Sequence, residues 1–177
     1  MSPMEEDSDL APWGRLGETL EGSFAARRRE LLTPEFAIFD RKDEEIGRLE
    51  VRGIEGAGLE VGDLEARIES PAPAAHTMLS RDAVILTAEP LGAWSVPEIK
   101  CPDRLYQGRL SLLRNTAEAG PAGERATVRI TGGLTNRNYQ ALFDASNEDS
   151  LPIAFFLLYL TVALRSKAYL TAFQQEQ

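Results

Sequence analysis

The chain has 177 residues and a formal net charge of −9, with 43% hydrophobic and 27% charged residues. These values describe a folded domain that can bury its own core, and they exclude disorder over the whole chain. The negative charge argues against nucleic-acid binding, which needs a concentrated basic surface. The single cysteine, Cys101, cannot form an internal disulfide, and the acidic start lacks the apolar stretch of a targeting signal. We therefore expect a cytoplasmic protein.

The N-terminal residues 1–22 are predicted to form a flexible acidic tail, because four acidic residues come before the first base, Arg15. Apolar residues between 16 and 32 indicate a short helix that stops before Pro34. Residues 27–29 are all arginine, and the sequence leaves open whether they belong to this helix or to the first strand. A single domain is predicted over residues 23–177.

From Phe36 onward the hydrophobic pattern changes to a period of two, which is typical of strands. Residues 36–40 and 45–51 are predicted to form a hairpin with a polar turn, and an exposed edge at 36–40 would allow pairing between chains. The oligomeric state is left open. Further strands are predicted at Leu64–Ser70 and Ala83–Ala88, with residues 71–75 (PAPAA) as a loop because prolines cannot pair within a central strand.

The clearest alternation lies in three later segments, where one side of each is apolar and the other polar. This pattern is typical of an antiparallel sheet that is wet on one side. The glycine- and proline-rich residues 117–124 and 131–136 are predicted to be turns. The apolar sides are formed by Tyr106, Gly108, Leu110 and Leu112, by Ala126, Val128 and Ile130, and by Tyr139, Ala141 and Phe143.

An uncharged segment follows at Leu151–Leu164, which is apolar on nearly every side if it is helical. Its fourteen residues would span about 21 Å, which is less than the ~30 Å of a bilayer core, so we predict a buried helix and no transmembrane span. A partial apolar stripe extends the predicted core helix to about residues 151–173. A barrel surrounds such a helix on every side, so the predicted fold is mainly β with α, an antiparallel β-barrel enclosing a hydrophobic C-terminal helix.

Two segments resemble the tubby-like β-barrel superfamily, which includes tubby C-terminal domains, phospholipid scramblases and LURP-one-related proteins. They are the hairpin FAIFDRKDEEIGRLEV at residues 36–51 and the closing segment RNYQALFDASNEDSLPIAFFLLYLTVAL at residues 137–164. The resemblance covers residues 36–164 in the order of the elements. It implies a barrel filled by its C-terminal helix, and a surface that holds an acidic lipid headgroup with basic residues.

Conventional catalytic and metal-binding patterns are absent from the sequence. One cysteine and one histidine do not supply the ligands of a zinc site, and His76, beside the PAPAA loop, is expected at the surface. The carboxylates at residues 43–45 lie in a predicted turn. We expect them to be solvated there, so burial would not raise their pKa values. We predict no catalytic residue, no metal and no cofactor, while a nucleophilic pairing of Cys101 with His76 stays open as a minor alternative.

Arginines are the candidate binding residues. Arg109, Arg125 and Arg129 fall on the polar sides of two segments predicted to be neighbouring strands, and Arg137 begins the next. If these strands pair, the guanidinium groups approach one another, and a shared anion would offset their repulsion. Neutralisation by nearby acidic residues is the alternative.

Three functions follow from these observations. The first is a non-catalytic binding or scaffold module of the tubby-like type, which engages acidic phospholipid headgroups or a protein partner and is peripheral to a membrane. The second is a membrane-associated protein that uses its C-terminal helix. The third is an enzyme whose site is hidden in the sequence.

Overall fold

The computed structural model describes residues 8–30, 34–72, 75–91 and 96–175. It contains helix α1 (Ala11–Thr19), a 3-10 turn η1 (Gly53–Glu55), helix α2 (Ser150–Gln175) and twelve strands. The strands are β1 (Ser23–Arg28), β2 (Glu35–Phe39), β3 (Glu45–Val51), β4 (Gly56–Val61), β5 (Leu64–Ala72), β6 (Ala75–Ser80), β7 (Ala83–Leu91), β8 (Val96–Lys100), β9 (Leu105–Ser111), β10 (Thr116–Pro121), β11 (Val128–Gly132) and β12 (Asn138–Phe143).

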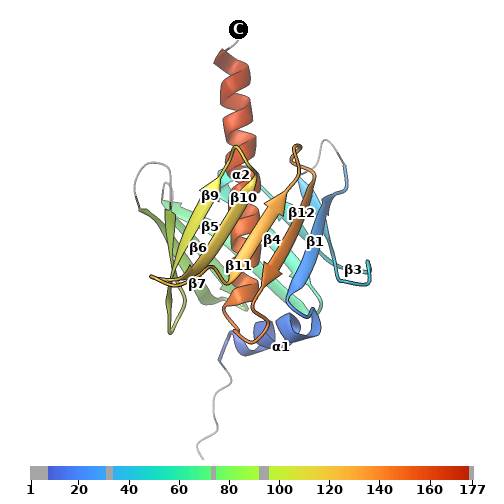
Figure 1. Cartoon of the computed structure of the whole chain (residues 1–177), viewed down its shortest axis with the longest axis vertical. Coiled ribbons are helices and arrows are strands. Elements are labelled where there is room, and N and C mark those ends of the chain that lie inside the picture. Colours follow the sequence, from blue (N-terminus) through green and yellow to red (C-terminus); the bar gives the residue numbers. More distant parts are fainter. Residues whose placement is uncertain (1–7, 31–33, 73–74, 92–95, 176–177) are drawn as a thin grey trace, which may run out of the picture.

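The strands form a closed antiparallel barrel in which each pairs with its neighbours in sequence and β1 pairs with β12 (Figure 1). The predicted fold class is confirmed. Strand β2 pairs with β1 on one side and β3 on the other, so the exposed edge expected at residues 36–40 is wrong. Because the barrel is closed, the backbone N–H and C=O groups of β2 form hydrogen bonds with β1 and β3. They are therefore not available for pairing with another chain.

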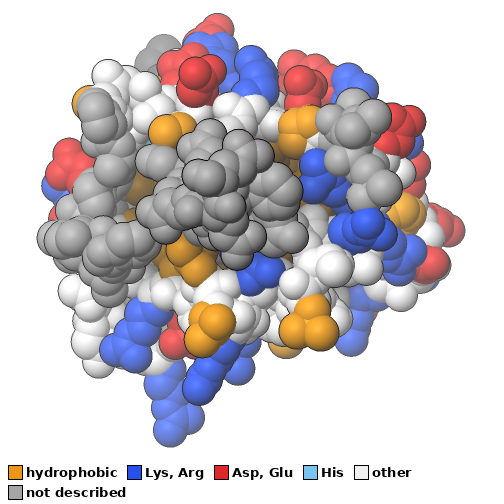
Figure 2. All heavy atoms as spheres, turned by 90° about the horizontal axis from the view of Figure 1, so that it is seen from above, with side chains coloured by type: hydrophobic (Ala, Val, Ile, Leu, Met, Phe, Trp, Pro, Cys, Tyr) orange, Lys and Arg blue, Asp and Glu red, His pale blue; other side chains and the backbone are white. Residues whose placement is uncertain are grey.

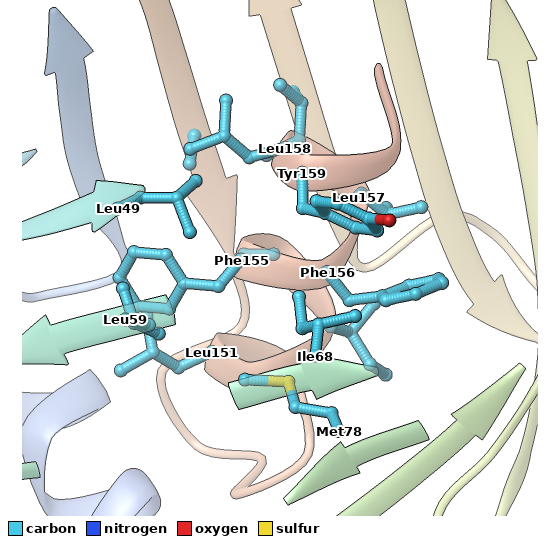
Figure 3. Close-up of a cluster of buried hydrophobic side chains, with 14 of the residues drawn as sticks. Leu49, Leu59, Ile68, Met78, Leu151, Phe155, Phe156, Leu157, Leu158 and Tyr159 are labelled. Atoms are coloured by element: carbon cyan, nitrogen blue, oxygen red, sulfur yellow. The ribbon is translucent and has the colours of Figure 1, made fainter. Parts of the chain in front are cut away.

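Helix α2 enters the barrel at the end where α1 lies and leaves at the other end (Figure 1). Residues 155–159 are completely buried. Their side chains leave the helix in several directions and approach Leu49, Leu59, Ile68 and Met78, which come from four successive strands (Figure 3). The predicted helix enclosed by the barrel is confirmed, because a helix that is apolar on all sides needs a wall on all sides. Its buried part covers residues 151–163, which is shorter than the predicted core helix of about 151–173.

Helix α1 lies across the barrel end where α2 begins (Figure 1) and replaces most of the predicted tail. Trp13 is fully buried, its indole Nε1 donates a hydrogen bond to Ser80 Oγ at 3.2 Å, and its ring lies 6.4 Å from that of Phe155. Residues 10–22 are therefore part of the packed structure, and residues 1–7 lie outside the described residues.

The helix predicted over residues 16–32 is wrong in its second half. The chain turns at Gly22, whose φ is +79°, and where an added Cβ would lie 2.6 Å from the backbone oxygen of Phe143. Only glycine tolerates this conformation without strain. Strand β1 follows, so Arg27 and Arg28 lie in the first strand, and Arg29 N–H donates to the Glu35 carbonyl beyond its end.

Several strands of the structure differ from the prediction. Residues 116–121, largely predicted as a turn, form β10, and β4, β6 and β8 were not predicted. Strand β5 also continues through Pro71 and Ala72, and β6 begins at Ala75, within the predicted loop. An added Cβ on Gly120 would lie 2.3 Å from the Arg125 backbone oxygen, so glycine permits this close approach of chains. Ala126, expected inside, is exposed before β11 begins.

Candidate functional site

The antiparallel order places the connections between strands alternately at the two ends of the barrel. The loops 112–115 and 133–137 lie at the end where α2 leaves, and we call this end the exit rim. The connection at residues 122–127 lies at the opposite end, where the backbone N–H of Asp144 donates to Thr127.

A basic surface follows the outward side of β9–β12 and the two loops at its upper edge. It carries Arg109, Arg114, Arg129 and Arg137, and we call it the basic face. Residues 105–121 and 128–143, which form it, contain these four arginines and one acidic residue, Glu118. These two segments therefore have a positive net charge. The remaining residues of the chain together have a net charge more negative than −9.

Glu118 lies between two of the arginines. On β10 it is directly opposite Arg109 of β9 and Arg129 of β11. Arg129 forms the ion pair, with its Nη2 at 3.2 Å from Glu118 Oε2. The expected pairing of these two arginine-bearing strands is wrong, since β10 separates them and places their backbones about 10 Å apart.

The remaining arginines of the basic face have no carboxylate within ion-pair distance among the described residues. These are Arg109, Arg114 and Arg137. Of the arginines predicted from sequence, three lie on this face, while Arg125 lies in the connection at the opposite end and does not join them. Sequence reasoning missed Arg114. The scarcity of acidic residues over 105–143, in a chain this negative, is the signal that could have found it.

The exit rim joins α2 to the two loops through hydrogen bonds. Arg165 of α2 donates through Nη1 to the Leu112 carbonyl and through Nη2 to the Leu134 carbonyl, the latter at 3.2 Å. Asn136 Nδ2 donates to the Val162 carbonyl and to Ser166 Oγ, at 3.4 and 3.2 Å. Asn115 joins the loops directly, because its Nδ2 donates to the Gly133 carbonyl at 2.8 Å.

Two leucines project from these loops into solvent. Leu113 is 95% exposed and Leu134 is 101% exposed, the two most exposed large hydrophobic residues of the described chain. Figure 2 looks onto the exit rim and shows Lys and Arg side chains gathered along its lower side with hydrophobic groups among them, while many of the acidic groups lie around the other sides. The rim thus combines unpaired positive charge with apolar tips.

Buried polar groups at the opposite end form a second cluster. Tyr106 donates its hydroxyl to Asp149 Oδ2 at 2.7 Å, and Asn147 Nδ2 donates to the Tyr106 oxygen at 2.9 Å. Burial, together with the hydrogen bond to Asp149, raises the pKa of Tyr106 to about 12. The cluster fastens the start of α2 to β9, and its groups have their partners within the fold.

The residues weighed for nucleophilic chemistry are not arranged for it. His76 is buried, which corrects its expected surface position, and its ring packs against Phe156 and Tyr159. Cys101 lies instead near Asp149 at the first turn of α2, and burial raises the pKa of its thiol, which keeps it protonated. Burial also lowers the pKa of His76. No Cys–His pair is formed.

A surface hollow of about 420 Å³ lies between the α1–β1 turn, β1, β12 and the β2–β3 turn. Its charges are already paired, because Arg27 Nη2 lies 2.6 Å from Asp43 Oδ1 and Arg41 Nη1 lies 3.0 Å from Glu21 Oε2. The hollow therefore offers a ligand little free charge. Within the described part of the chain, no set of three His, Cys, Asp or Glu residues converges as a metal site, and neither helix has the length and hydropathy of a membrane span.

Comparison with known proteins supports the fold. No family model and no curated protein sequence matches the chain. The X-ray structure of the Arabidopsis thaliana protein AT5G01750 superposes with a TM-score of 0.54 at 9% identity, over 82% of this chain and 91% of that chain. The two chains therefore share a helix-filled barrel, and at this identity the likeness concerns the fold alone.

Proposed function

We propose that this chain is a non-catalytic binding module of the tubby-like type, related to the LURP-one-related proteins, whose basic face binds acidic phospholipid headgroups as a peripheral membrane protein in the cytoplasm. The shared barrel with its enclosed helix supports the fold part of this proposal. The interior is filled by α2, so ligand recognition falls to the outer surface and the rims.

The observation that carries the proposal is the free charge of the basic face. Three of its four arginines have no carboxylate partner in the described structure, although the chain has a net charge of −9. The unpaired arginines repel one another because they carry the same charge. An anionic surface would replace this repulsive cost with a favourable attraction. Each arginine near an anionic lipid surface contributes about 1 kcal/mol of binding free energy.

The test uses flotation of the full chain with phosphatidylcholine vesicles that contain or lack phosphatidylserine. We expect binding to the anionic vesicles only. The double variant Arg114→Glu/Arg137→Glu should lose at least about thirtyfold in partition coefficient, because removing two arginines costs about 2 kcal/mol of attraction and the new carboxylates add repulsion. The matched control is Arg104→Glu/Arg125→Glu, which makes the same charge change at the opposite end.

Equal losses in both double variants would show that only net charge matters and would refute the basic face as the binding surface. Binding of the unaltered chain to neutral and anionic vesicles alike would refute headgroup recognition. An absence of binding to either vesicle would refute the lipid function and leave a protein partner as the ligand of the basic face.

A further inference from the structure

The two leucine tips of the exit rim lie in the same loops as two of the unpaired arginines. Leu113 precedes Arg114 in the β9–β10 loop, and Leu134 lies three residues before Arg137 in the β11–β12 loop. The hydrogen bond from Asn115 to Gly133 holds the two loops together at 2.8 Å. An apolar pair is thus placed next to a positive pair at one edge of the molecule.

The loops that carry these leucines are braced rather than loose. Arg165 binds a carbonyl of each loop, and Asn136 binds α2, so both tips are fixed to the helix that fills the core. The backbone N–H of Gly132 also donates to the Asn115 carbonyl at 2.8 Å. A tip that is already ordered loses little conformational entropy when it is buried by a partner, which favours binding.

Leu113 and Leu134 are fully solvated, so their side chains do not contribute to the folding stability of the unbound chain. The apolar surface of a leucine becomes favourable only when it leaves water. Single exposed apolar residues are common on proteins, but here two occupy adjacent loop tips and are flanked by arginines that lack partners. This is the arrangement that a membrane interface stabilises, since headgroups bind the charges and acyl chains receive the leucines.

We propose that Leu113 and Leu134 insert into the acyl region of an anionic bilayer when the basic face binds its headgroups. This inference rests on the proposed function and adds the docked orientation, in which the exit rim faces the membrane and α1 faces away. The last turns of α2 leave the barrel on the same side (Figure 1).

The first experiment measures partitioning of the full chain to phosphatidylserine-containing vesicles for Leu113→Ala/Leu134→Ala. We expect at least a tenfold loss of partition coefficient, because the removed methyl and methylene groups no longer enter the bilayer. The salt dependence of binding should keep its slope, since the arginines are untouched. The control is Val84→Ala, which removes exposed apolar surface outside the basic face, at the end of β7 that faces away from the rim.

The second experiment measures depth of insertion directly. An environment-sensitive fluorophore on Leu134→Cys should shift to the blue and be quenched by nitroxide-labelled acyl chains, whereas the same label on Val84→Cys should not respond. The native Cys101 is buried and does not compete for the label at the surface.

The outcomes separate the inference from the proposed function. Binding that depends on Arg114 and Arg137 but is unchanged in the leucine double variant, with no quenching at position 134, would overturn insertion and leave headgroup binding standing. No binding of the unaltered chain to anionic vesicles would overturn both, and would point to a protein partner for the rim. A tenfold loss together with quenching at position 134 supports the docked orientation.

Discussion

Asp149 shows how a single buried carboxylate is held at the start of the core helix. It accepts a hydrogen bond from the Tyr106 hydroxyl at 2.7 Å, and its own backbone N–H donates to Asn147 Oδ1 at 3.0 Å. A negative group at a helix N-terminus also interacts favourably with the helix dipole. Tyr106 is therefore a structural residue, which fastens α2 to the barrel wall.

Replacing Tyr106 by Phe should lower the free energy of unfolding by about 1.5–3 kcal/mol, because a buried carboxylate loses its donor. Urea unfolding measures this change. The matched control is Tyr159→Phe, which removes a hydroxyl that is equally buried but has no hydrogen-bond partner among the described residues. We expect that variant to stay within about 0.5 kcal/mol of the parent or to be stabilised. Equal losses in both would contradict the role of the Tyr106–Asp149 bond.

His76 gives the chain a pH dependence of stability. Burial lowers its pKa in the folded chain, so the unfolded chain takes up the proton first as the pH falls below the ordinary value of about 6.5. Stability is then lost as the pH falls, by up to about 2 kcal/mol between pH 7 and pH 5. Urea unfolding across this range should show the loss in the parent chain and a smaller one in His76→Phe. The same slope in both chains would contradict this assignment, since His76 is the single histidine.

Among the elements, helix α2 and the β2–β3 hairpin could be predicted from the sequence nearly residue by residue. Both have strong local signals: an uncharged apolar segment of helical length, and two alternating segments around a polar turn. Strand β10 carries a weak signal, because alanine replaces large apolar residues on its inner side. Small residues suit this wall, since α2 already fills the space inside, but that reason is visible only in the assembled barrel.

The dependence of the barrel on α2 can be measured at Phe155. Its ring stacks on Phe24 of β1 with centroids 4.4 Å apart, and it is fully buried. Phe155→Ala should lower the free energy of unfolding by about 3–5 kcal/mol through lost burial and a cavity. Leu134→Ala, on the exit rim, should change it by less than about 0.5 kcal/mol because the side chain is exposed. A small effect at Phe155 would contradict a helix packed as the core.

At the scale of the whole molecule, charge is distributed unevenly around one filled barrel. The sequence identified Arg109, Arg129 and Arg137 as candidates, and the structure places all three on the basic face. It could not identify the role of Glu118, because β10 was predicted to be a turn and the two arginine-bearing strands were thought to be adjacent. Arg125 was included because the strand that carries Arg129 was predicted to begin near residue 124, whereas β11 begins at Val128. The leucine tips and their bracing by Arg165 depend on contacts between distant segments, which no local pattern contains.

We infer that this negatively charged chain binds anionic membranes through one positive surface. The most direct measurement is cosedimentation of the unaltered full chain with vesicles of pure phosphatidylcholine and with vesicles that also contain phosphatidylserine, at low and at raised salt. We expect binding to the anionic vesicles alone, and this binding should weaken as salt screens the arginines. Absence of binding to anionic vesicles at low salt, where a chain of net charge −9 needs its basic face to bind at all, would contradict it.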